Sequence, residues 1–270
     1  KLALFPLHLW LPNAYAYAPS AVTAFLAATA TKVAVYVLLR FFFTVFGAPF
    51  SFGTMRLDIV LLPLALAGIF SASVAAIFQT DVKRMLAYSS VAQIGYMILG
   101  ISLVSVTGLT AGISHLFNHA LMKGALFMAL GCVSFRVGAA KLERMAGVGR
   151  TMPWTMGAFV IGGLSLIGVP LTAGFVSKWY LVVGALEKGW WPVAVLVLIS
   201  SLLAVIYIWR VVEVAYFEPA PEGEAAGEAP LALLVPTWTL ALANLYFGLD
   251  TSLNAGVARR AAEMLLGVAP

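Results

Sequence analysis

Charge is scarce in this sequence. Only 10% of the 270 residues are charged, whereas 62% are hydrophobic, and the mean hydropathy is +1.00. Soluble globular chains do not have this balance, so the composition excludes that class. Several apolar stretches exceed the roughly 20 residues that a helix needs to cross a bilayer, and the alternating pattern of barrel strands is lacking. We therefore predict an all-α integral membrane protein, a polytopic helical bundle.

Cysteine is nearly absent as well. The single Cys132 excludes an internal disulfide, and no Cys/His cluster is spaced to hold a metal ion or an iron–sulfur cluster. Glycine patterns for nucleotide binding are missing, and the basic residues form no aromatic-interleaved stripe for nucleic acid. We expect no cofactor, no metal, no nucleic-acid partner and no redox chemistry in this chain.

The apolar stretches predict about seven full transmembrane helices. They cover approximately residues 19–46, 59–78, 85–106, 109–135, 153–187, 190–217 and 231–248. The fifth should be discontinuous, because Gly168, Pro170 and Gly174 lie at bilayer depth. Proline removes a helical hydrogen bond there and glycine weakens the helix. Residues 1–11 are expected to be the end of a truncated first helix, stopped by the prolines of FPLHLWLP.

The C-terminal part has a different pattern. The acidic, proline-rich stretch 218–230 predicts a solvated loop. Beyond Asp250, apolar residues recur at a spacing of four beside Arg259 and Arg260, which suits an amphipathic helix at the membrane interface or on a partner. The apolar residues are Leu253, Val257, Ala261 and Leu265. We divide the chain into a transmembrane domain over 1–249 and an amphipathic segment over 250–270.

Three protonatable groups interrupt an apolar stretch, HLFNHALMK, at residues 115–123. His115, His119 and Lys123 lie four residues apart, so they share one helical face and form a row about 12 Å long. Either histidine alone is explained equally well as a hydrogen-bonding group between helices. A lysine at mid-depth costs at least about 2.5 kcal/mol on insertion scales, which favours a functional role for Lys123. Together the three groups predict a proton relay.

Two further lysines occupy comparable positions. Lys32 lies near the middle of its predicted helix, and Lys178 follows the expected helix break, where unwound backbone can line a wet cavity. A lysine amine can release and rebind a proton, which an arginine cannot do.

Acidic residues are missing from the same depth. All eleven lie in loops or close to helix ends: Asp58, Asp81, Glu143, Glu187, Glu213, Glu218, Glu222, Glu224, Glu228, Asp250 and Glu263. A buried cation normally needs a counter-charge or abundant water. We therefore expect the partner carboxylate in a preceding N-terminal half or in another subunit.

Long motifs resemble a known family. The stretch KLALFPLHLWLPNAYAYAPSAVTAFLAATATKVAVYVLLR is similar to the seventh and eighth transmembrane segments of the antiporter-like proteins shared by Mrp-type cation/proton antiporters and respiratory complex I. QTDVKRMLAYSSVAQIGYMILG, SHLFNHALMKGALFMALG and GVPLTAGFVSKWYL resemble later family segments, the last of them the broken twelfth. GFVSKWYL and the step from Lys1 to Lys32 look most like the D-subunit branch of the Mrp antiporters.

The resemblance implies a fold and a set of roles. The family has fourteen spans with two inverted five-helix repeats, so this chain would hold about segments seven to fourteen. Lys1 would be the lysine of the seventh segment, whose usual glutamate partner this chain does not contain. Lys32 would be a bridging lysine, and Lys178 the terminal lysine of the half-channel. His115, His119 and Lys123 would form the central relay.

Three functions follow as hypotheses. The first is a subunit of a multisubunit monovalent cation (Na⁺)/proton antiporter, partnered by other membrane subunits. The second is a proton-translocating membrane subunit of NADH:quinone oxidoreductase or of a related membrane-bound hydrogenase, with the redox chemistry in other subunits. The third is a structural membrane subunit whose lysines bind anionic lipid or partner carboxylates.

Overall fold

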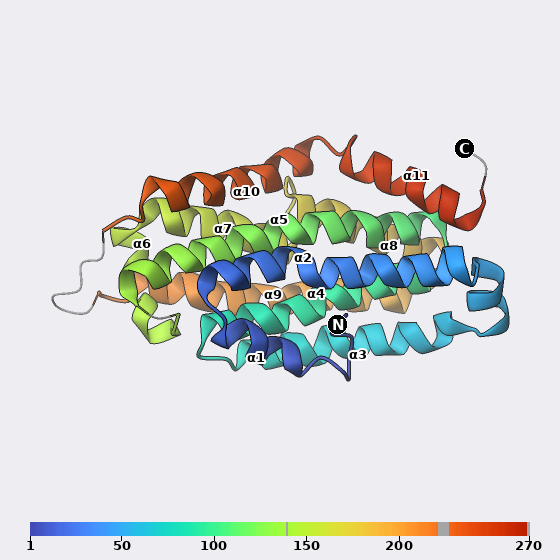
Figure 1. Ribbon diagram of the computed structural model, residues 1–270, viewed down its shortest axis with the longest axis horizontal. Coiled ribbons are helices and arrows are strands. Elements are labelled where there is room, and N and C mark those ends of the chain that lie inside the picture. The colour runs from blue at the N-terminus through green and yellow to red at the C-terminus, as the bar shows by residue number, and fades with distance from the viewer. Residues whose placement is uncertain (139, 221–226, 269–270) are drawn as a thin grey trace.

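The protein is an elongated bundle of helices that run side by side (Figure 1). The computed structural model describes residues 1–138, 140–220 and 227–268. In this described part, six helical stretches are long and apolar enough to cross a membrane. They are Ser20–Val45, Leu57–Ile77, Val82–Ser102, Val106–Val137, Trp191–Phe217 and Leu231–Leu249. The first comprises α2 (Ser20–Leu39) and a π-helical continuation over Arg40–Val45, and the others are α3, α4, α5, α9 and α10.

The fifth predicted span, residues 153–187, is broken, as expected. Its halves are α7 (Pro153–Ile167) and α8 (Ala173–Glu187). Gly168 ends α7 with a left-handed φ of 90°, which only glycine adopts without strain, and Pro170 lies in the connecting turn. The polytopic all-α architecture with a discontinuous helix is therefore confirmed.

The remaining helices are short. They are α1 (Trp10–Tyr17), a π-helical turn at Pro49–Thr54, a 3₁₀ turn at Leu142–Met145, α6 (Val148–Thr151) and α11 (Asn254–Leu266). The structure differs from expectation at the start of the chain, because Lys1–Leu4 is not helical and α1 begins only at Trp10. Pro6 has no N–H to donate and disfavours a helical conformation at Phe5. Pro12 is tolerated because it lies in the first turn of α1.

Side-chain caps explain where several helices begin. The Asp81 carboxylate accepts from the Arg84 N–H at 2.9 Å, and the Ser105 hydroxyl accepts from the Gly108 N–H at 3.1 Å. Each cap satisfies an N–H that the first turn leaves without a partner. α4 and α5 consequently start three residues earlier than the apolar pattern alone predicts.

The acidic stretch before α10 also contributes a cap. The Glu228 carboxylate accepts from the Trp154 N–H at 2.9 Å and from the Thr155 hydroxyl at the start of α7. Negative charge is stabilised at a helix N-terminus. Glu222 and Glu224, predicted to lie in a solvated loop, fall outside the described residues.

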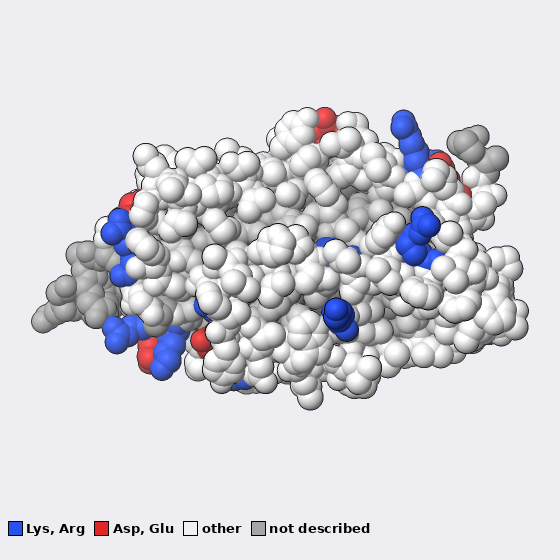
Figure 2. All heavy atoms as spheres, viewed as in Figure 1, with Lys and Arg blue, Asp and Glu red and all other residues white. Residues whose placement is uncertain are grey.

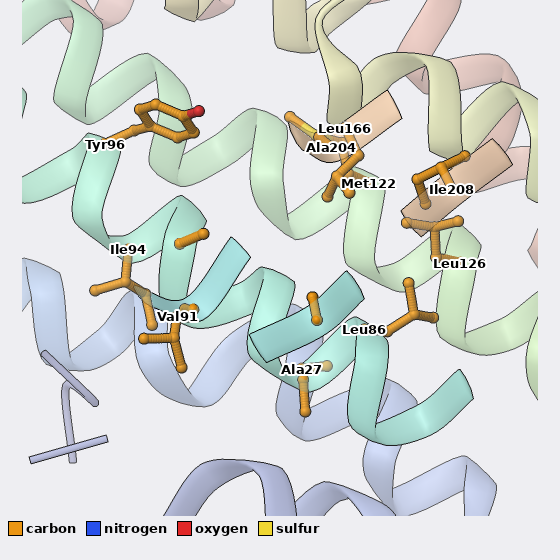
Figure 3. Packing of buried hydrophobic residues seen from close by; sticks show 14 of the residues in the cluster. Ala27, Leu86, Val91, Ile94, Tyr96, Met122, Leu126, Leu166, Ala204 and Ile208 are labelled. Carbon is orange, nitrogen blue, oxygen red and sulfur yellow. The ribbon is translucent and has the colours of Figure 1, made fainter. Parts of the chain in front are cut away.

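Two helices form the centre of the bundle. Within α4, 94% of the most apolar 18-residue window is buried, compared with 39% in α3, so polar residues of α4 face other helices. α5 packs against α2, α4, α7, α8, α10 and α11. Figure 3 shows buried side chains of this core, among them Leu86 of α4, Leu126 of α5 and Ile208 of α9.

The outer surface is apolar over much of its length. Phe25, Trp191 and Leu202 are each at least 65% exposed, as lipid-facing side chains of a membrane bundle would be. Figure 2 shows charged side chains gathered mostly toward the two ends of the long axis. α11 packs against α5 with its small residues Ala258 and Ala262 buried, while Leu253 and Val257 stay exposed.

The helix break depends on a close backbone approach that a methyl group would prevent. A Cβ added to Gly174 would lie 1.8 Å from the Ser165 carbonyl oxygen. We expect Gly174→Ala to destabilise the intact protein by about 1–3 kcal/mol, the usual cost of overpacking, and to lower its melting temperature in detergent. Gly131→Ala is the control, because its Cβ would lie 3.6 Å from the Cβ of Ser20, an ordinary contact. Equal melting temperatures for the two variants would contradict this account.

Candidate functional site

The centre of α5 places His115, His119 and Lys123 on one buried face. Their exposed fractions are 2%, 0% and 0%. The two imidazole rings are nearly parallel, with centroids 6.0 Å apart and an interplanar angle of 3°. The sequence-predicted row therefore faces other helices rather than lipid, and the structure brings its three members together.

Lys123 is held by α4. Its Nζ donates to the Leu86 carbonyl oxygen at 2.7 Å and to the Ser89 hydroxyl. The ring of Phe127 lies 5.9 Å away, within the range of a cation–π contact. The amine thus has oxygen partners although it lies deep in an apolar bundle.

His115 has one partner at each ring nitrogen. Nε2 lies 2.9 Å from Gln93 Oε1 on α4, and Nδ1 lies 2.7 Å from the Ser177 hydroxyl on α8. An amide oxygen only accepts, so the arrangement suits a neutral ring that donates from Nε2 and accepts from Ser177 at Nδ1. Ser177 directly precedes Lys178, so His115 connects α5 to the broken helix.

His119 differs from its neighbour. Both of its ring nitrogens are buried and have no hydrogen-bond partner among the described residues. Buried polar groups in proteins nearly always have a protein or ordered-water partner. His119 lies one helical turn from both His115 and Lys123, so a bridging water at its ring would extend the row.

The helix break supplies the site of Lys178. Its Nζ donates to the carbonyl oxygens of Leu166 and Ile167, at 3.0 and 2.8 Å, and to the Ser201 hydroxyl on α9 at 3.1 Å. The last carbonyls of a helix have no intrahelical partner and carry the negative end of its dipole. Gly168 makes room, since a Cβ there would lie 2.9 Å from Cδ of Lys178. The interruption in the span therefore creates a cation site without a carboxylate.

Lys32 is buried in α2, which packs against α5. Its Nζ donates to the Ala27 carbonyl of its own helix. The amine is also close enough to His115, His119 and Lys123 to interact with each electrostatically. Lys32 thus adjoins the row from the α2 side, and its assignment as a bridging lysine stays a prediction.

Lys1 does not join this group. It is exposed at the start of the chain, outside the buried row of the other five residues. Its assignment as a paired lysine stays a prediction.

Sequence reasoning missed the oxygen partners of the row. Carbonyl and hydroxyl oxygens accept from Lys32, Lys123 and Lys178. A signal for two of the missed side chains existed, because Ser89 and Gln93 are polar residues one turn apart inside an apolar stretch. The partners on α8 and α9 come from distant parts of the chain and have no such local signal.

A second polar link joins the break to the C-terminal helix. The Asn118 amide of α5 donates to the Ala173 carbonyl at 2.7 Å, and the Asn254 amide donates to Asn118 Oδ1 at 3.0 Å. Asn118 is fully buried and Asn254 is 7% exposed. The first residues of α8 and α11 therefore both hydrogen-bond to Asn118 of α5, which lies one turn from His115 and directly precedes His119.

Comparison with known proteins identifies the family. The model described as "NADH:quinone oxidoreductase/Mrp antiporter, TM" matches residues 1–204. The chain belongs to this family. It is therefore a membrane-embedded member of this family, in agreement with the resemblance drawn from the motifs.

The relatives come from both branches of the family. NADH-quinone oxidoreductase subunit N of Desulforudis audaxviator is 44% identical, over 92% of this chain and 52% of the relative. The Na⁺/H⁺ antiporter D-subunit of Alkalihalophilus pseudofirmus is 30% identical, over 92% of this chain and 50% of the relative. The chain thus spans about half the length of these curated relatives.

Solved structures share the fold over nearly the whole chain. A chain of the Mrp complex from Dietzia sp. superposes with a TM-score of 0.90 at 28% identity, covering 98% of this chain and 57% of that one. A chain of respiratory complex I from Thermus thermophilus gives a TM-score of 0.86 at 25% identity, covering 98% and 56%.

The surroundings of His119 generate a structural prediction. In an experimental structure of the intact protein at a resolution that shows water, we expect ordered water within hydrogen-bond distance of at least one His119 ring nitrogen. Tyr15 is the internal comparison, because its buried hydroxyl already donates to the Leu26 carbonyl and needs no water. A His119 ring packed only against apolar groups, or turned toward lipid, would contradict the expectation.

Proposed function

We propose that this chain carries part of the proton pathway of a multisubunit, ion-translocating membrane complex. The observation that carries the proposal is the buried row from Lys32 through Lys123, His119 and His115 to Lys178. Each member is at most 6% exposed, and the row connects three separate helices and the helix break. Groups that bind and release protons are costly at this depth, and function is the usual reason for keeping them there.

The chemistry of the row suits proton transfer. Lysine and histidine both exchange protons, whereas carbonyl and hydroxyl oxygens stabilise an ammonium group without permanently neutralising it. The buried lysines of the row have no carboxylate hydrogen-bonded to them in the described part of the chain, so a proton that arrives is not trapped in a local ion pair. Counter-charge would come from the remainder of the complex, including the partner glutamate proposed for Lys1.

Two kinds of complex are candidates for driving proton translocation through this chain. A monovalent cation/proton antiporter, with Na⁺ as the cation, is supported by the 0.90 TM-score with a chain of the Mrp complex and by the antiporter relative from Alkalihalophilus pseudofirmus. A redox-driven complex is supported by the 44% identity with NADH-quinone oxidoreductase subunit N, compared with 30% for the antiporter relative. In either case other membrane subunits would be partners, and the redox chemistry of the second case would lie outside this chain.

Reconstitution of the intact complex in vesicles separates these two candidates. An imposed Na⁺ gradient that moves protons without an electron donor would identify an antiporter. Proton movement that requires an electron donor and acceptor, and ignores the Na⁺ gradient, would identify a redox-driven pump.

The role of Lys178 is tested by Lys178→Arg in the same complex. Arginine keeps the positive charge but does not release its proton in the working pH range. If the amine transfers protons, we expect normal assembly and a fall in proton translocation of at least about 100-fold, the low end of what positioned proton-transfer groups contribute. Lys178→Ala should also assemble, because it removes a costly buried charge.

Lys188→Arg is the matched control, since Lys188 is exposed at the end of the same helix. Full translocation by the Lys178→Arg complex would indicate a fixed electrostatic role and would support the structural-subunit hypothesis.

A further inference from the structure

A tyrosine–serine hydrogen bond joins α4 to α9, and a second tyrosine lies beside a serine of the facing helix. Ser89 and Tyr96 lie seven residues apart on α4, and Ser200 and Tyr207 lie seven apart on α9. Seven residues make about two turns and about 10 Å, so each helix presents both hydroxyls on one face. The Tyr96 and Ser200 hydroxyls are 2.7 Å apart, and Tyr207 is close enough to Ser89 and Tyr96 to interact with both. The two helices run antiparallel, so each tyrosine faces the serine of the other helix.

These pairs reach both buried lysines of the half-channel. At one level, Lys123 donates to the Ser89 hydroxyl. At the other, Lys178 donates to the Ser201 hydroxyl at 3.1 Å and lies 4.8 Å from the centroid of the Tyr96 ring. Hydroxyl groups of α4 and α9 therefore lie beside both lysines, and none of these contacts uses a histidine.

Tyr207 is the unexplained member of this set. Its side chain is fully buried, and its hydroxyl has no hydrogen-bond partner among the described residues. A buried hydroxyl without a partner costs free energy that phenylalanine, with nearly the same shape, would avoid. A hydroxyl that alternates between Ser89, Tyr96 and water would account for the tyrosine, because a hydroxyl both donates and accepts.

We propose that Ser89, Tyr207, Tyr96, Ser200 and Ser201 form a second proton route between Lys123 and Lys178, parallel to the route through His119 and His115. The proposal rests on the proposed function and adds new proton-carrying residues to it. A proton leaves the Lys123 ammonium for the Ser89 oxygen, and each hydroxyl passes its own proton onward as it accepts one. The neutral Lys178 amine takes up the last proton. Only O–H and N–H bonds break and form, and no electrons are transferred.

The test uses the intact complex with Tyr207→Phe, His119→Leu and the double variant. Phenylalanine keeps the volume of Tyr207, and leucine removes a ring that makes no hydrogen bond to the described residues. We expect each single variant to assemble and to lose no more than about threefold in proton translocation, because the other route remains. The double variant should fall at least about tenfold below the product of the two single effects, since both routes are then interrupted. Tyr216→Phe is the control, because this partly buried tyrosine lies near the C-terminal end of α9, nine residues from Tyr207.

Other outcomes separate this proposal from the broader one. If His119→Leu alone abolishes translocation, or if adding Tyr207→Phe to it changes nothing further, the second route is overturned. Lys178→Arg in the same preparation reports on the proposed function. If Lys178→Arg loses translocation, and the double variant shows only the product of the Tyr207→Phe and His119→Leu effects, the proposed function is retained. Only the hydroxyl route is then rejected. Full translocation in the Lys178→Arg variant would overturn both.

Discussion

The architecture of the site depends on one interaction, the donation of hydrogen bonds by buried ammonium groups to uncharged oxygens. An isolated cation in a low-dielectric interior is strongly destabilised. Here the Lys178 amine is met by the terminal carbonyls of α7 and the Lys123 amine by a carbonyl and a hydroxyl of α4. Such partners lower the cost of the charged form and leave the amine free to become neutral, which an adjacent carboxylate would oppose.

The broken span follows from the same constraint. A continuous helix through residues 168–172 would engage the Ile167 carbonyl with the Leu171 N–H, and Lys178 would lose that acceptor. The Leu166 carbonyl would keep no helical partner, because Pro170 has no N–H. The glycines at the break are therefore linked to the lysine by geometry. Gly168 leaves space for the lysine stem, and Gly174 lets α8 approach the end of α7. The break between α7 and α8 and the buried position of the Lys178 amine therefore depend on each other.

Much of this arrangement was predictable from local features of the sequence. Hydrophobic length identified the spans, the Gly–Pro–Gly pattern located the break, and the four-residue spacing placed His115, His119 and Lys123 on one face. Asp81 and Ser105 cap α4 and α5, so both helices begin earlier than hydropathy predicts. Capping is a local sequence signal that hydropathy does not contain.

What the sequence did not reveal was mostly tertiary. The contacts of His115 with Ser177 and of Lys178 with Ser201 join residues far apart in the chain, and no periodicity encodes such pairs. The same holds for Glu228, which belongs to an apparently solvated acidic stretch and yet caps α7. Family resemblance supplied roles for the lysines, but the hydroxyls around them emerged only when the helices were placed in space.

The partnership of Lys123 with α4 has a consequence for biosynthesis. On its own, α5 carries two histidines and a lysine on one face and would partition poorly into lipid as an isolated segment. α4 precedes it and is joined to it by only Leu103–Ser105, so the Leu86 carbonyl and the Ser89 hydroxyl have already emerged when Lys123 leaves the ribosome. If the two helices insert together as a hairpin, Lys123 packs against α4 during insertion. Its charge is then shielded from the acyl chains.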